Sequence, residues 1–301
     1  MLDETPMNLN ISVPTVYDQY TLQGIDKRGI KQRINTELVK RYSGTSLANN
    51  AKASIMPLFF SNYPITFAEG LYKAQKEKVY PIEMVISCYD SYQLSELPTP
   101  PLYLKKALDL ETAQAFSIGN QGSLSLITSL HLFNIYKKTG ILSCLEQINS
   151  IYEQNPIKNM YEKREAISLI QVSEMKLPLK VRKYRLEHVS ELNQTLNDLA
   201  AISIKQIHSI LLQMGMDQEE IMIIPHCFSK DFEERFTSNF QNVYVRSEKY
   251  NLSTCDPFYS LKEYLEQKSD LRYIFLNIID PLGVGCILLE ANNIIQNSGG
   301  E

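Results

Sequence analysis

The segment Ala115-Phe116-Ser117-Ile118-Gly119-Asn120-Gln121-Gly122-Ser123 decides the fold of this chain. It begins with residues that favour a β-strand, passes through a tight polar turn, and runs into an apolar pattern of helical spacing over residues 124–138. Free backbone N–H groups and the helix dipole at the start of a helix favour developing negative charge. The segment therefore predicts a strand-to-helix elbow in which Ser123 is either a nucleophile or an ordinary residue of the first helical turn.

Composition bounds the class of protein. The 301 residues are 44% hydrophobic and 21% charged. This is typical of a soluble globular protein with one large domain or two domains of about 150 residues. The net charge of −4 and the lack of a Lys/Arg-rich arm argue against a nucleic-acid partner. No apolar run reaches the ~20 residues that span a bilayer, so no membrane partner is expected.

The N-terminal sequence and the spacing of the cysteines favour a cytoplasmic protein without a bound metal. The N-terminal sequence MLDETPMNLN is acidic and polar, unlike a secretory signal. The five cysteines lack Cys-x-x-Cys spacing, so we interpret them as reduced core residues. No P-loop, GxGxxG or HExxH spacing supports a nucleotide cofactor or a zinc protease. An α/β hydrolase is excluded, because Gln121 and Ser125 stand where the GxSxG elbow needs glycines.

Strand-like and helix-like segments alternate along the chain. Short apolar runs typical of buried strands cover residues 82–88, 115–118, 166–172, 221–224, 243–245, 273–278 and 285–290, and helical patterns cover residues 65–75, 102–108, 124–138, 189–214, 230–236 and 258–267. This alternation predicts an α/β fold with sheets buried between helices. We divide it into two similar α/β halves, residues 1–172 with the elbow and residues 173–301. The role of residues 1–50 is left open.

Two polar residues of the second half are candidates for chemistry. His226 follows a buried strand and Pro225, at the edge where α/β folds build their sites. The alternative is a histidine that bonds only the backbone. Asn251 lies in a polar turn and can donate to a substrate oxygen, although turn asparagines often bond their own backbone. We interpret His131, on the elbow helix, as a packed or hydrogen-bonded core histidine and Asp256 as the N-cap of the next helix.

Taken together, these segments resemble the ketoacyl-ACP synthase III family of thiolase-like enzymes across most of residues 60–290. Residues 116–140 match the family's nucleophile strand and helix, residues 223–226 its strand with a catalytic histidine, residues 250–253 its Gly-Asn-Thr-Ser turn, and residues 283–290 its last glycine-rich turn and strand. Counting back from Ser129-Leu130 places Ser123 at the family's cysteine, whereas counting forward from Phe116 places Gly122 there. We keep the helix register, because an inserted residue is easier to accommodate in a turn than in a helix.

The resemblance implies a thiolase-like fold and an acyltransferase whose catalytic residues are Ser123, His226 and Asn251. Ser123 would take an acyl group from CoA or an acyl-carrier protein, with His226 as general base and backbone N–H groups as oxyanion donors. Asn251 and His226 could also polarise an incoming thioester. No permanently bound cofactor is implied, since acyl-CoA or acyl-carrier phosphopantetheine is the substrate.

The replacement of cysteine by serine changes the expected reaction. Serine is a weaker nucleophile than a thiolate and needs a base, and its ester is a poorer acyl donor for carbon–carbon bond formation. We therefore expect simple acyl transfer to an acceptor, in fatty-acid-like or specialised metabolite biosynthesis, in preference to Claisen condensation.

Other departures from the family support a second hypothesis, a catalytically inactive thiolase-fold subunit that pairs with an active ketosynthase-like partner. Tyr250 replaces the glycine beside Asn251, and residues 161–166 lack the glycines of the family's Gly-Asp-Gly-Ala segment, which permit close backbone approach. The strand that opens the family's fold is not evident in residues 1–40. Because thiolase-like proteins resemble one another in dimerising through the nucleophile-bearing half, we expect a homodimer or a heterodimer with a thiolase-like paralogue.

Overall fold

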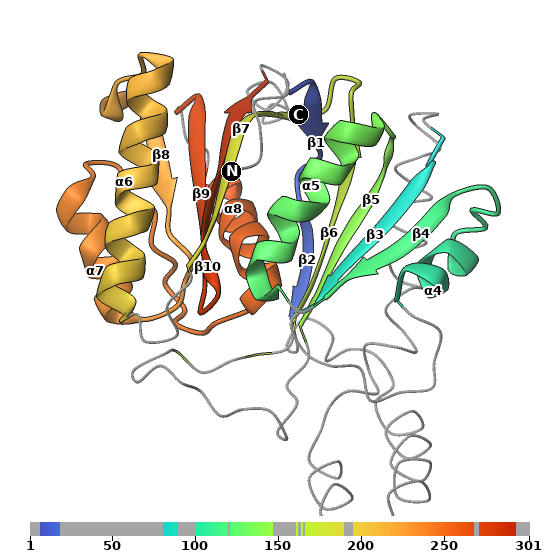
Figure 1. Cartoon of the computed structure of the whole chain (residues 1–301), viewed down its shortest axis with the longest axis horizontal. Helices are drawn as coiled ribbons and strands as arrows, with labels where there is room; N and C mark the ends of the chain where they lie inside the picture. The colour runs from blue at the N-terminus through green and yellow to red at the C-terminus, as the bar shows by residue number, and fades with distance from the viewer. Residues whose placement is uncertain are drawn as a thin grey trace, which may run out of the picture.

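The computed structural model describes residues 7–18, 81–89, 100–119, 121–146, 161, 164, 166–189, 195–267 and 271–292. Within these residues, one ten-stranded mixed sheet runs through the molecule, with helices on its faces (Figure 1). The expected α/β class is confirmed. The helix predicted over residues 65–75 lies outside the described residues. In the described ranges, no helix combines the length and the apolar character needed to cross a bilayer.

The first half supplies one side of the sheet. Its elements are β1 (Leu9–Ile11), β2 (Thr15–Asp18), β3 (Met84–Tyr89), α4 (Pro100–Ala107), β4 (Gln114–Ile118), the 3₁₀ turn η2 (Gly122–Leu124), α5 (Ser125–Tyr136), β5 (Gly140–Glu146) and β6 (Ala166–Ser173). β3 pairs in parallel with β4 and β5, while β6 is antiparallel to β5 and to β1. The opening strands that the sequence did not reveal are β1 and β2. With three and four residues, they are too short to carry a readable pattern.

The second half supplies the other side. Its elements are β7 (Leu179–His188), α6 (Leu196–Met214), the 3₁₀ turn η3 (Gln218–Glu220), β8 (Ile221–Ile224), α7 (Lys230–Asn239), the 3₁₀ turn η4 (Ser253–Cys255), α8 (Asp256–Glu266), β9 (Tyr273–Asp280) and β10 (Gly283–Ala291). The strand predicted over residues 243–245 is reduced to an isolated parallel bridge between Val243 and Ile223.

The two halves repeat one strand order, read outward from the centre of the sheet. The first half runs β1, β6, β5, β3, β4, and the second runs β7, β10, β9, β8 and the Val243 bridge. In each half, the strand that comes last in the sequence therefore lies beside the strand that comes first. β1 and β7 pair antiparallel, so the halves form one continuous sheet and not two separate ones. The two similar halves are as predicted, and the boundary between residues 172 and 173 stays a prediction.

Apolar side chains on both faces of the strands define three layers of helices. In β3, Met84 and Ile86 join the core cluster that includes α5 and α8, whereas Val85 between them joins the cluster under α4. In β9, Leu276 belongs to the cluster of α5 and α8, and Phe275 to that of α6 and α7. This alternation is expected of a strand that is buried on both faces, because successive side chains point to opposite faces of the sheet. The helices α5 and α8 thus form the central layer.

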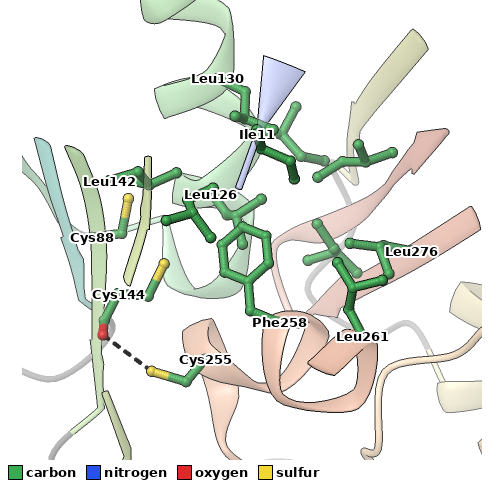
Figure 2. Close-up of a cluster of buried hydrophobic side chains, with 14 of the residues drawn as sticks. Ile11, Cys88, Leu126, Leu130, Leu142, Cys144, Cys255, Phe258, Leu261 and Leu276 are labelled. Carbon is green, nitrogen blue, oxygen red and sulfur yellow. Dashed lines mark hydrogen bonds between the residues drawn. The ribbon is translucent and has the colours of Figure 1, made fainter. Parts of the chain in front are cut away.

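The central layer is tightly packed. Figure 2 shows Leu126 of α5 and Phe258 of α8 in one cluster with Leu142 of β5 and Leu276 of β9. The cluster joins strands of both halves, so it fixes the first turn of α5 against the first turn of α8.

All five cysteines are free and buried (Cys88, Cys144, Cys227, Cys255 and Cys286).

Candidate active site

The elbow predicted around Ser123 forms at the end of β4. After Ile118 the chain passes into η2, which contains Ser123, and from there into α5. Gly122 has a φ of 51°, in the left-handed region that favours glycine. Its carbonyl accepts a 2.7 Å hydrogen bond from the Ser125 hydroxyl. Ser123 is only 2% exposed, so the candidate nucleophile lies beneath the surface at the start of the central helix.

His226 and Asn251 lie on two loops of the second half. His226 follows β8 by two residues, and Asn251 precedes η4 by two. Each residue is 1% exposed. His226 Nε2 and Asn251 Oδ1 lie 3.3 Å apart, within hydrogen-bonding distance. The fold therefore brings these two candidate residues into direct contact.

A chain of hydrogen bonds connects this pair to the elbow through Ser253. The hydroxyl oxygens of Ser123 and Ser253 lie 3.5 Å apart, and the Ser253 N–H donates to Asn251 Oδ1 over 2.7 Å. Ser253 begins η4, which leads into α8 as η2 leads into α5. The equivalent turns of the two halves thus meet, and they place Ser123, Asn251 and His226 in one buried polar cluster. Sequence reasoning passed over Ser253; its position two residues after Asn251 was the available signal.

The hydrogen bonds of His226 favour a role as donor. The Ile279 N–H donates to Nδ1 over 3.4 Å, so the proton of the neutral ring is assigned to Nε2, from which it is donated to Asn251. A nitrogen that already carries a proton cannot receive one from Ser123. Among the described residues, the hydroxyl of Ser123 is hydrogen-bonded to Ser253 and not to His226. This arrangement disfavours the general-base role expected from the sequence.

The backbone N–H of Ser123 contacts a carboxylate of the other half. It donates to Asp280 Oδ2 over 3.2 Å, and the Leu282 N–H donates to Asp280 Oδ1 over 3.0 Å. Asp280 is the last residue of β9 and is 6% exposed. One of the backbone N–H groups at the start of the helix, which the sequence suggests as oxyanion donors, is therefore bonded to a side-chain anion. Asp280 lies between the strands predicted over residues 273–278 and 285–290, and sequence analysis assigned it no role in the site.

A buried ion pair holds the two loops together. Asp256 accepts from the backbone N–H of Cys227 over 2.7 Å and from that of Leu252 over 3.3 Å, the residues that directly follow His226 and Asn251. Arg246 Nη2 lies 2.9 Å from Asp256 Oδ1, with both side chains fully buried. Asp256 is the first residue of α8 and Cys255 its N-cap, so the N-cap predicted at Asp256 was wrong.

The environment of Arg246 maintains its charge. Burial lowers the pKa of its guanidinium, but the Asp256 carboxylate and other neighbours outweigh that effect and raise the pKa above its ordinary value. The guanidinium carbon lies 4.6 Å from the centre of the Tyr250 ring and 5.0 Å from that of Tyr259. Tyr250, which stands beside Asn251, therefore packs against the cation that anchors this loop.

His131 lies away from this cluster. His131 is half-buried, and its Nδ1 is 2.5 Å from the hydroxyl of Tyr184 on β7, so it is a hydrogen-bonded histidine and not a fully buried core residue. Burial raises the pKa of Tyr184 to about 12. In the ranges that the structure describes, no group of three His, Cys, Asp or Glu side chains could hold a metal ion.

Comparisons with known proteins agree with this architecture. No family model matches the sequence, and no curated protein matches it. The chain is similar in structure to the acyltransferase ChlB3, with a TM-score of 0.67 and 11% identity over 94% of this chain and 97% of that one. It is also similar to 3-oxoacyl-[acyl-carrier-protein] synthase III of Aquifex aeolicus, with a TM-score of 0.58 and 14% identity over 95% and 99%.

A third similar structure is the type III polyketide synthase domain of Steely1 from Dictyostelium, with a TM-score of 0.61 and 12% identity over 95% and 98% of the two chains. The chain therefore has the thiolase-like fold. Its structural resemblance to ketoacyl synthase III-like enzymes is confirmed. Because the identities are so low, the reaction must be argued from the residues of the site.

Proposed function

We propose that this protein is an acyltransferase similar to ketoacyl-ACP synthase III. It takes an acyl group from CoA or an acyl-carrier protein onto Ser123 and passes it to an acceptor, in fatty-acid-like or specialised metabolite biosynthesis. The observation that carries the proposal is the buried hydrogen-bonded chain from Ser123 through Ser253 and Asn251 to His226. It unites three sequence-distant candidates at the junction of the two halves. Similar structures include an acyltransferase and a ketoacyl synthase III, which supports this class of reaction.

The chemistry has two steps. The Ser123 oxygen forms an ester bond to the acyl carbon while the carbon–sulfur bond breaks, and the hydroxyl proton leaves with the departing thiol. The acceptor then attacks the ester and the serine regains its proton. We assign two side-chain donors to the carbonyl oxygen as negative charge develops: the amide N–H of Asn251, and the Nε2–H of His226 once it exchanges Asn251 Oδ1 for that oxygen. The acyl donor's phosphopantetheine enters as part of the substrate, so the proposal needs no resident cofactor.

The decisive experiment detects the acyl-enzyme directly. Purified protein is incubated with acetyl-CoA, octanoyl-CoA and the corresponding acyl-carrier thioesters, and its intact mass is measured. We expect an acyl adduct in the native chain and none in Ser123→Ala. Ser117→Ala on β4 is the matched control, because the Ser117 hydroxyl has no hydrogen-bond partner among the described residues. An adduct that persists in Ser123→Ala contradicts Ser123 as the nucleophile.

A second candidate function is a catalytically inactive subunit that pairs with an active thiolase-like partner. The contact between Asp280 and the Ser123 N–H favours it, since that contact occupies the donor an active site would use. The strand β4, beside the elbow, pairs with β3 alone among the described strands, which leaves an edge for such a partner. Under this proposal no donor leaves an adduct and the chain co-purifies with a thiolase-like paralogue. Under the first proposal, the active acyltransferase, the chain alone forms a cytoplasmic homodimer.

A further inference from the structure

Asp280 is held at the elbow by backbone hydrogen bonds from both halves of the molecule. The Leu282 N–H, in its own hairpin turn, donates to Oδ1, and the Ser123 N–H donates to Oδ2 over 3.2 Å. The two residues of the Ser123–Asp280 contact are 157 positions apart in sequence. A carboxylate fixed between two N–H groups is a stronger acceptor than a neutral oxygen. The carboxylate is therefore oriented by its own turn towards the start of the central helix.

Gly122 provides the space that this carboxylate occupies. A Cβ atom at position 122 would lie 1.8 Å from Asp280 Oδ2 and 2.5 Å from Asp280 Cγ. Any other side chain at position 122 would therefore displace the carboxylate. The left-handed φ of 51° at Gly122 also disfavours other residues. Position 122 and position 280 are thus matched to each other, which indicates a built contact and not an incidental one.

We infer that Asp280 is an autoinhibitory residue of this site, whose carboxylate occupies the place where the oxygen of a bound thioester would become negative. The catalytic consequence rests on the proposed function, whereas the contact itself does not. The Ser123 N–H can stabilise an oxyanion only when that N–H is free. A carboxylate at the same point also repels the developing charge. Loss of one oxyanion donor typically lowers turnover by about 10²–10³-fold, so removal of the Asp280 carboxylate should raise acylation of Ser123 on this scale.

The contact is tested by stability measurements that need no activity. The urea midpoint is compared for the native chain, Gly122→Ala, Asp280→Ala and the double variant. If the carboxylate lies against Gly122, the Gly122→Ala change lowers the midpoint much more in the native background than in the Asp280→Ala background, where only the strained φ remains. Equal shifts in the two backgrounds overturn the contact.

The inhibitory role is tested by the rate of Ser123 acylation, followed by intact mass with acetyl-CoA and octanoyl-CoA. We expect Asp280→Ala to react about 10²-fold faster than the native chain, with Asp280→Asn also faster because it removes the charge while keeping the size. Asp231→Ala, at an exposed position of α7, is the control and should react at the native rate. An Asp280→Ala rate equal to or below the native rate overturns the inference. If no chain reacts with any donor, the proposed function fails, and the urea comparison still decides the contact.

Discussion

Replacement of Asp256 by Asn should destabilise the protein more than any surface ion-pair change. Asp256 and Arg246 are both fully buried, so water does not screen their 2.9 Å interaction. Asp256→Asn removes the anion and leaves the guanidinium of Arg246 uncompensated in the core. Breaking a buried pair in this way costs about 3–5 kcal/mol.

The same substitution also disturbs two backbone contacts. The carboxylate accepts from the Cys227 N–H with one oxygen and from the Leu252 N–H with the other. The amide of Asn has only one oxygen, so one of these two N–H groups loses its partner. A buried N–H without a partner costs roughly 1–3 kcal/mol. These effects are not strictly additive, and we expect a total loss of about 4 kcal/mol, a large share of the roughly 5–15 kcal/mol that stabilises a typical domain.

Urea denaturation followed by far-UV circular dichroism measures this loss. The matched control is Glu234→Gln, which breaks the exposed pair of Lys230 and Glu234, whose side chains are 78% and 61% exposed. That change should cost about 0.5 kcal/mol or less. The double variant Arg246→Met with Asp256→Leu should be more stable than Asp256→Asn, because it leaves no unpaired buried charge. A loss below about 1 kcal/mol in Asp256→Asn refutes the claim that this pair anchors the two loops.

Three further predictions follow from single contacts. Asn251→Ala should lower acyl-transfer turnover by about 10²-fold with an unchanged circular dichroism spectrum; unchanged turnover would leave Asn251 as a turn residue only. Gly140→Ala should cost about 1–3 kcal/mol in urea, because the new Cβ would lie 2.2 Å from the fixed carbonyl oxygen of Met84. Burial raises the pKa of Glu290, but hydrogen bonds from two arginines outweigh burial and lower it below 4.5. Since the folded pKa is depressed, this stabilisation is present above pH 4.5 and is lost as the pH falls through the lower folded value. Glu290→Gln should therefore flatten the acid limb of a plot of urea midpoint against pH, and an unchanged limb would contradict this assignment.

Local pattern was sufficient to predict the elbow and the two loops of the second half. The run from Phe116 to Ser123 combines β-prone residues, a turn and a helical period, and the strand before His226 is a clean apolar run. β7 was missed because charged residues at half-buried and exposed positions interrupt the apolar pattern of its sequence LKVRKYRLEH. Its pairing with β10 is what fixes it as a strand, and sequence pattern does not contain that pairing.

The contacts that control the site were beyond sequence reasoning for a related reason. Asp280 meets Ser123 across 157 positions, and Asp256 meets Cys227 across 29. Each of these aspartates has an ordinary local explanation, as a turn residue or a helix cap, that is sufficient by itself. Only tertiary packing gives them a second role, because it brings the end of β9 against η2 and the start of α8 against the loop that follows β8.

The two hypotheses for this protein now differ at one group of atoms. Both have a buried serine at the elbow, connected through Ser253 to the hydrogen-bonded pair of Asn251 and His226. An active enzyme must free the Ser123 N–H from Asp280, or else stabilise the oxyanion with His226 and Asn251 alone, at the lower rate that one missing donor implies. An inactive subunit needs neither, because the carboxylate then serves to tie the elbow of one half to the hairpin of the other. A slow native enzyme that Asp280→Ala accelerates is therefore the outcome that separates an inhibited catalyst from a structural subunit.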